Sequence, residues 1–183
     1  MVLSGTNARW SKFTPTITRE GTFPVRSCLW ANRGIAALQV QVKSADITAI
    51  QLVIGNRHIV IVSVYLPARD RSLSPGENKE AIRRELRILG EEIEKERLQQ
   101  PDTELVIAGD FNRHNLLWGG DDVGVARIQG EAEPILEFNE QFNLQSLLPR
   151  GTKTFQGTGG ATSTIDLVLA TARLAEELVS CGL

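Results

Sequence analysis

The segment that most constrains the fold of this chain is ELVIAGDFNRHNLLWGG, residues 104–120. It opens with a continuous apolar run over residues 105–108, which is typical of a strand covered on both faces. Gly109 permits a tight exit from that strand, so Asp110 and Asn112 follow at its C-terminal end. An isolated Gly-Asp often marks only a turn. In α/β folds, catalytic and binding residues usually lie at the C-terminal ends of strands, so the segment predicts a functional loop.

Alternating apolar residues predict a meander of strands in the first third of the chain. A short connection at Gly55-Asn56-Arg57 predicts an antiparallel hairpin between two of them. The strands are expected over residues 27–31, 35–42, 47–54 and 58–65. Further strands are expected at 144–148 and 165–170, with a Gly/Thr-rich loop over 151–162.

Two helices are predicted from capping and periodicity. Ser74-Pro75-Gly76-Glu77 has the spacing of a capping box with proline at the first helical position, so a helix should run from there to about Gln99. Charged pairs four residues apart favour a solvated outer face for this helix over a charged binding surface. A second helix is expected over 133–142, and residues 172–183 are helix-like. This patterning alone predicts an α+β fold.

Composition limits the remaining possibilities. A chain of 183 residues with 42% hydrophobic content suits one domain spanning residues 1–183. The net charge of −2 includes no basic tail, so contact with DNA would depend on local arginines and metal ions. Cys28 and Cys181 lack metal-ligand spacing and are expected to be reduced. With no signal peptide or membrane-spanning run, we expect a soluble intracellular protein, nuclear or cytoplasmic, without a membrane partner.

Three fragments carry a family resemblance: VSVYLP at 62–67, GDFNRH at 109–114 with Trp118-Gly119, and STIDLVL at 163–169. In this order they resemble the endonuclease/exonuclease/phosphatase superfamily, and more closely the endonuclease domain of non-LTR retrotransposons. The likeness covers about residues 10–171. It implies a four-layer α/β/β/α sandwich, which we expect to be incomplete and truncated at both ends.

The resemblance implies roles for four residues. Asp110 would orient and deprotonate the attacking water and bind the metal, which is Mg²⁺ or Mn²⁺. Asn112 would hydrogen-bond the phosphate or the water, and Tyr65 would donate to a phosphate oxygen. Asp166 would support an active-site histidine. Tyr65 could equally be a rim aromatic, whereas an unpaired carboxylate in the apolar strand of Asp166 would be costly and favours function.

Five further residues are candidates for DNA contact, each with an alternative. His114 could touch DNA, order the loop or, less plausibly, bind a metal. Trp118 could stack on a base or pack under the loop. Polar residues of the Gly/Thr-rich loop could contact phosphate or simply be solvated. The candidates are Arg113, His114, Trp118, Thr154 and Ser163.

Departures from the family pattern bear on activity. The sequence has no match to the family's Gln-Glu pair, whose glutamate binds the metal, or to its closing Ser-Asp-His, and its only histidines are His58 and His114. We therefore expect weak metal and DNA binding. Three hypotheses follow: a Mg²⁺-dependent DNA endonuclease, a catalytically dead remnant that at most binds DNA or protein, and a small-molecule phosphoesterase. Missing strands would also expose sheet edges and favour self-association.

Overall fold

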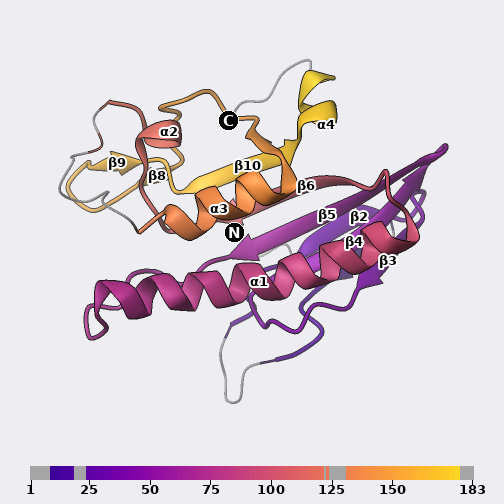
Figure 1. Ribbon diagram of the computed structural model, residues 1–183, viewed down its shortest axis with the longest axis horizontal. Coiled ribbons are helices and arrows are strands. Elements are labelled where there is room, and N and C mark those ends of the chain that lie inside the picture. The colour runs from indigo at the N-terminus through magenta and orange to yellow at the C-terminus, as the bar shows by residue number, and fades with distance from the viewer. Residues whose placement is uncertain (1–8, 19–23, 122, 124–130, 178–183) are drawn as a thin grey trace.

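The computed structural model describes residues 9–18, 24–121, 123 and 131–177. Its centre is a six-stranded sheet (Figure 1). The strands lie side by side in the order β3 (Ala37–Val40), β4 (Ile47–Ile54), β5 (Arg57–Tyr65), β6 (Glu104–Asp110), β10 (Asp166–Thr171) and β7 (Leu144–Ser146). Only β5 and β6 are parallel, and α1 (Pro75–Gln99) provides the crossover that a parallel pair requires.

One face of the sheet is covered by α1 and α3 (Glu133–Phe142) (Figure 1). The predicted capping box is present, because the side chains of Ser74 and Glu77 accept each other's backbone N–H. The two helices meet where Gly90 of α1 leaves room for the ring of Phe142, 3.4 Å from the place a Cβ would occupy. The predicted bounds of both helices are confirmed. Apolar residues of α1 are buried against the sheet: Ile82, Leu86, Leu89 and Ile93.

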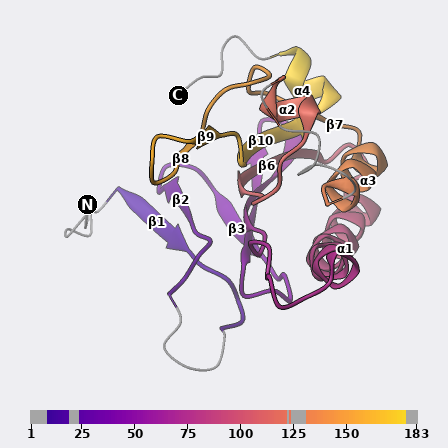
Figure 2. The same cartoon turned by 90° about the vertical axis from the view of Figure 1, so that its left-hand side faces the viewer.

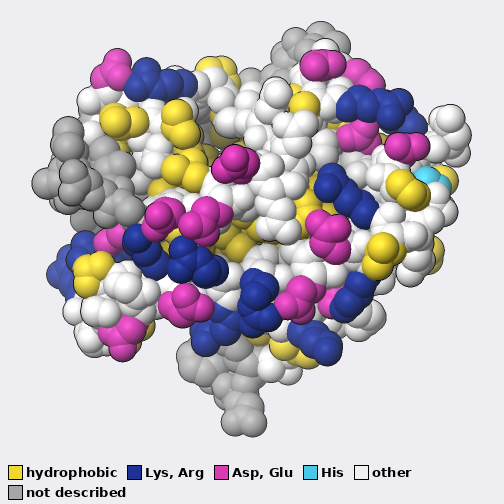
Figure 3. All heavy atoms as spheres, in the orientation of Figure 1, with side chains coloured by type: hydrophobic (Ala, Val, Ile, Leu, Met, Phe, Trp, Pro, Cys, Tyr) yellow, Lys and Arg dark blue, Asp and Glu magenta, His cyan; other side chains and the backbone are white. Residues whose placement is uncertain are grey.

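The outer face of α1 carries interspersed charges of both signs (Figure 3). Arg87 and Glu91 pair at 2.7 Å, as do Lys95 and Glu92. Neutralised pairs of this kind fit the predicted solvated face. None of the helices in the described ranges is long and apolar enough to cross a membrane.

The opposite face of the sheet carries a second, two-stranded sheet (Figure 2). It consists of β1 (Trp10–Phe13) and β2 (Leu29–Asn32), which pair antiparallel. Ala31 packs there with Ile50 and Leu52 of β4 in a small separate core. The chain therefore buries apolar residues on both faces of its main sheet, and the predicted α+β class is confirmed.

Several local expectations need adjustment. The strand expected at 27–31 begins at Leu29; before it, the Ser27 hydroxyl lies 2.8 Å from both the Thr48 hydroxyl and the Ser63 carbonyl. Four short elements fell outside the predicted strands and the two long helices: β1, α2 (Leu116–Gly119), β8 (Phe155–Gln156) and β9 (Thr162–Ser163). The expected C-terminal helix is present as α4 (Ala172–Glu176). Residues 178–183, with Cys181, lie outside the described residues.

Candidate active site

Three of the residues singled out by the sequence form one row across three strands. Tyr65 of β5 is opposite Asp110 of β6, and Asp110 is opposite Asp166 of β10. Their neighbours Val64 and Leu167 are buried in the core under the helices. Because successive side chains of a strand point to opposite faces, the row projects from the face that α1 and α3 leave uncovered.

Gly109 determines how closely β6 approaches β5 at this row. Its φ of +149° is a conformation that L side chains rarely adopt, and a Cβ there would lie 1.9 Å from the Val64 carbonyl oxygen. No side chain can be accommodated at that distance. Glycine at this position therefore brings Asp110 into line with Tyr65 and Asp166.

Asn112 closes the loop that leaves β6. It adopts a left-handed conformation, with φ of 50°. Its backbone N–H donates to Asp110 Oδ1 at 2.9 Å, and its amide nitrogen donates to the Leu66 carbonyl at 3.0 Å. The Asn112 side chain also hydrogen-bonds the Asp110 carboxylate. The structure thus brings Asn112 together with the row.

The electrostatics of the row favour a cation. Burial raises the pKa of Asp110, and the charge of Asp166 raises it further, against the lowering effect of the hydrogen bonds from Asn112. The described residues contain no cluster of three or more His, Cys, Asp or Glu side chains that could hold a metal. Mg²⁺ keeps several waters and needs only one or two carboxylates, so this pair fits such an ion as a partial ligand set.

Arg26 and Asp46 are site residues that the sequence did not reveal. The guanidinium of Arg26 lies 4.2 Å from the centre of the Tyr65 ring and pairs with Asp46 through two hydrogen bonds of 2.8 and 2.5 Å. The Asp46 carbonyl also accepts the Tyr65 N–H. The one signal available in the sequence was that Arg26 and Asp46 each come immediately before a predicted strand, at 27–31 and 47–54. Together they fix Tyr65 beside the carboxylates.

Thr154 positions Asp166. Its hydroxyl oxygen accepts hydrogen bonds from the backbone N–H groups of Ile165 and Asp166 at 3.1 and 3.0 Å. Ser163 lies in β9, where its carbonyl accepts the Thr154 N–H. Both side chains are half-buried and order the entry to β10.

Two of the candidates for DNA contact are buried, and for Trp118 this is the packing alternative. Arg113 is 2% exposed and donates to the carbonyls of Pro67 and Asn112. Trp118 is 5% exposed and donates through its indole N–H to the Arg113 carbonyl. Both side chains therefore hold the loop together from inside, and Arg113 also lines a polar pocket beside this loop. His114 is half-buried at the edge of a polar pocket that also includes Asn112.

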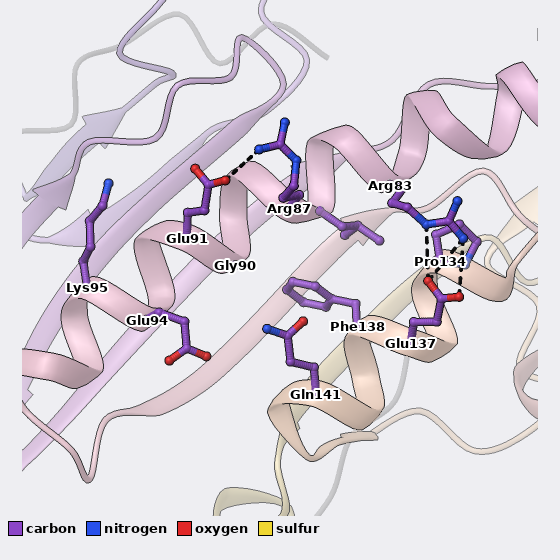
Figure 4. Close-up of a pocket in the computed structure, with 11 residues that line it drawn as sticks. Arg83, Arg87, Gly90, Glu91, Glu94, Lys95, Pro134, Glu137, Phe138 and Gln141 are labelled. Carbon is purple, nitrogen blue, oxygen red and sulfur yellow. Dashed lines mark hydrogen bonds and ion pairs between the residues drawn. The ribbon is translucent and has the colours of Figure 1, made fainter.

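A groove of about 500 Å³ lies between α1 and α3 (Figure 4). Phe138 lines it, and Glu137 pairs with Arg83 at its edge at 3.3 Å. It is on the helical face of the sheet, whereas the row of Tyr65 and the two aspartates is on the other. This groove is therefore separate from the candidate site.

Comparisons with known proteins agree with this geometry. The sequence model of the endonuclease–reverse transcriptase family matches residues 59–182. The endonuclease domain of TRAS1, a telomere-specific non-LTR retrotransposon, superposes with a TM-score of 0.61 at 19% identity, over 91% of this chain and 69% of that domain. No curated protein matches the sequence significantly.

More distant structures share the fold. TDP2 of D. rerio, solved with a single-strand DNA product, gives a TM-score of 0.54 at 8% identity over 90% of this chain. The catalytic domain of human Nocturnin, solved with a sulfate anion, gives 0.52 at 14% identity over 90% of this chain. The chain spans 62% of each of these two structures, less than two thirds of their length.

The predicted endonuclease/exonuclease/phosphatase-type fold is confirmed by these likenesses. The described residues contribute a helical layer, the six-stranded sheet and a two-stranded part of the facing layer. The family generally uses divalent metals. With its family model matched over more than half of its length and its acidic row at the ends of β5 and β6 and the start of β10, the chain belongs to the endonuclease–reverse transcriptase family.

Proposed function

We propose that this domain hydrolyses phosphodiester bonds of DNA with the help of a divalent metal ion, and that this chain alone does so weakly. The observation that supports the proposal is the row of Tyr65, Asp110 and Asp166, with Asn112 hydrogen-bonded to Asp110. Carboxylates that could hold a cation, next to hydrogen-bond donors, suit a substrate whose reacting group is an anion.

Each residue has a chemical role in this proposal. Asp110 would orient the attacking water and accept its proton, and with Asp166 beside it would hold Mg²⁺ or Mn²⁺. The ion would neutralise charge that develops on the phosphate and the leaving oxygen. Tyr65, fixed by Arg26, would donate its hydroxyl to a phosphate oxygen, and Asn112, beside Asp110, would hydrogen-bond the phosphate or the water.

Weak activity is expected from the sequence itself. It has no match to the family's metal-binding Gln-Glu or its phosphate-binding Ser-Asp-His. Loss of a single electrostatic contact to the transition state typically costs about 2.7–4 kcal/mol. The lack of matches to these two motifs favours the alternative, a domain that only binds DNA or protein.

The test is nicking of supercoiled plasmid with Mg²⁺ or Mn²⁺ by the wild type, Asp110→Ala and Asp102→Ala. Asp102 is exposed at a turn away from the row, so its variant is the matched control. We expect slow, chelator-sensitive nicking that Asp110→Ala abolishes and Asp102→Ala retains. Equal background from all three proteins would reject hydrolysis and leave the binding module. Preference for a small phosphoester over plasmid would instead support a small-molecule phosphoesterase.

A further inference from the structure

A polar pocket of about 570 Å³ lies beside the candidate active site. Asn112 lines it and also belongs to the loop that caps Asp110. The other polar side chains around it come from two loops, after β5 and after β6, and from the segment before α3. They are Arg69, Arg71, Arg113, His114 and Glu131.

Positive charge dominates this pocket. Three arginines line it against one carboxylate, Glu131, which pairs with Arg69 at 3.3 Å. Arg71 is exposed, and its side chain extends from the loop that follows Tyr65-Leu66-Pro67. The net charge of the arginines and Glu131 therefore favours an anionic ligand.

The buried arginine at the inner wall strengthens this preference. Arg113 is 2% exposed, and its Nε has no hydrogen-bond partner in the described part of the chain. Burial lowers the pKa of Arg113; the charge of Glu131 opposes this shift, and the charge of Arg69 adds to it. An anion beside the buried guanidinium of Arg113 would stabilise its charge, and the exposed guanidinium of Arg69 adds a second cation next to it.

The chemistry of the ligand follows from the donors and their place. Guanidinium groups match the oxygens of phosphate in a two-pronged geometry. The pocket shares Asn112 with the proposed catalytic row, so a strand whose reacting phosphate lay at Asp110 would extend past it. We propose that this pocket, the Arg71 pocket, binds a backbone phosphate of the DNA strand next to the reacting one. This inference rests on the proposed function.

The test is binding of a fluorescently labelled DNA duplex, measured by anisotropy in EDTA over a series of salt concentrations. We compare wild type, Arg71→Ala, Arg71→Lys and Arg84→Ala; Arg84 is also exposed but lies on the helical face. Arg71→Ala should weaken binding about 3- to 10-fold at low salt and reduce the salt slope by about one unit, as expected for one phosphate contact. Arg71→Lys should keep part of the affinity, and Arg84→Ala should bind as the wild type does.

The outcomes separate this inference from the proposed function. Unchanged affinity and slope for Arg71→Ala, or no DNA binding by the wild type, would overturn it whether or not the protein nicks plasmid. Loss of nicking in Asp110→Ala with intact binding bears only on catalysis. Inorganic phosphate at matched ionic strength serves as the competing source. If it displaces DNA from the wild type but not from Arg71→Ala, DNA and phosphate share the pocket, as proposed. If phosphate binds the wild type and not Arg71→Ala while both proteins bind DNA equally, the pocket is a free-phosphate site and the assignment to DNA is wrong.

Discussion

Asp110 and Asp166 are directly opposite each other on β6 and β10, so two carboxylates share one end of the sheet. This pairing costs stability when both are ionised. The pKa of Asp110 is raised by burial and then by Asp166, which means that the folded state holds the Asp110 proton more tightly than the unfolded state does.

The first prediction follows from the sign of that shift. The stability that the Asp110 proton contributes is fully present below the unfolded pKa and is lost as pH rises through the folded pKa. Asp110→Asn keeps the oxygen that accepts the Asn112 N–H and removes the charge. Near pH 7 it should raise Tm by roughly 2–4 °C, which corresponds to about 1 kcal/mol in a chain of this size. Solvent screens the charge of this partly exposed carboxylate, so this shift in Tm is an upper bound.

Thermal unfolding followed by circular dichroism between pH 3 and pH 8 measures this. The difference from wild type should shrink toward low pH, where both forms are uncharged. Asp102→Asn, at an exposed turn, should show no such trend. A destabilising Asp110→Asn at neutral pH would contradict the argument.

The second prediction concerns the approach of β6 to β5. Gly109→Ala should destabilise the fold by about 3 kcal/mol or more, because the new Cβ would lie 1.9 Å from the Val64 carbonyl oxygen. Gly55→Ala is the matched control, since Gly55 also has a positive φ but no atom within 4 Å of the added Cβ. It should cost only about 1–2 kcal/mol. Urea unfolding compares the two, and equal losses would show that close approach is not the cause.

The third prediction concerns Trp118. Trp118→Phe should cost about 1–2 kcal/mol by removing the hydrogen bond to the buried Arg113 carbonyl. Trp118→Ala should cost about 3–5 kcal/mol through the cavity it leaves. DNA affinity of the folded Trp118→Phe protein should match the wild type. If Trp118→Phe instead lost DNA affinity without losing stability, the indole of Trp118 would be a base-stacking surface.

The fourth prediction tests the support of Tyr65. Arg26→Ala should lower the free energy of unfolding by about 2–3 kcal/mol. Breaking a fully buried ion pair typically costs about 3–5 kcal/mol, and the cost is smaller here because Arg26 is partly exposed. Tyr65 is the only tyrosine of the chain, so labelled tyrosine gives a single ring spectrum by NMR. Arg26→Ala should shift that spectrum and broaden it. Arg26→Lys should retain charge but lose the two-pronged bond to Asp46. An unchanged Tyr65 ring spectrum in Arg26→Ala would show that Arg26 does not support Tyr65.

The fifth prediction concerns self-association. In the described part of the chain β3 is an edge strand of the main sheet, and Leu38 on it is 68% exposed. Exposed apolar edges pair with other copies, so we expect concentration-dependent association by sedimentation. Leu38→Lys should reduce it, whereas Leu98→Lys, at the end of α1 with 84% exposure, should not. A wild type that is monomeric at high concentration would refute this.

Much of the layout could be predicted from local sequence. The helix bounds at 75–99 and 133–142 follow from the Ser74 cap, proline placement and apolar periodicity, all of which act within a few residues. The same holds for the hairpin turn at Gly55-Asn56, which is local backbone chemistry. The three motif fragments also identified the family and the strand ends that bear Tyr65, Asp110 and Asp166.

Tertiary structure alone decided the rest. The salt bridge between Arg26 and Asp46 joins residues twenty positions apart. The Arg26 guanidinium stacks on Tyr65 only because β5 brings that ring beside it. The burial of Arg113 and Trp118, which their polar groups did not suggest, depends on how the β5 and β6 loops pack. Local propensity and spacing specify elements and their ends, because those energies arise between near neighbours. Charge pairing and burial arise between distant segments, so they exist only once the sheet has assembled.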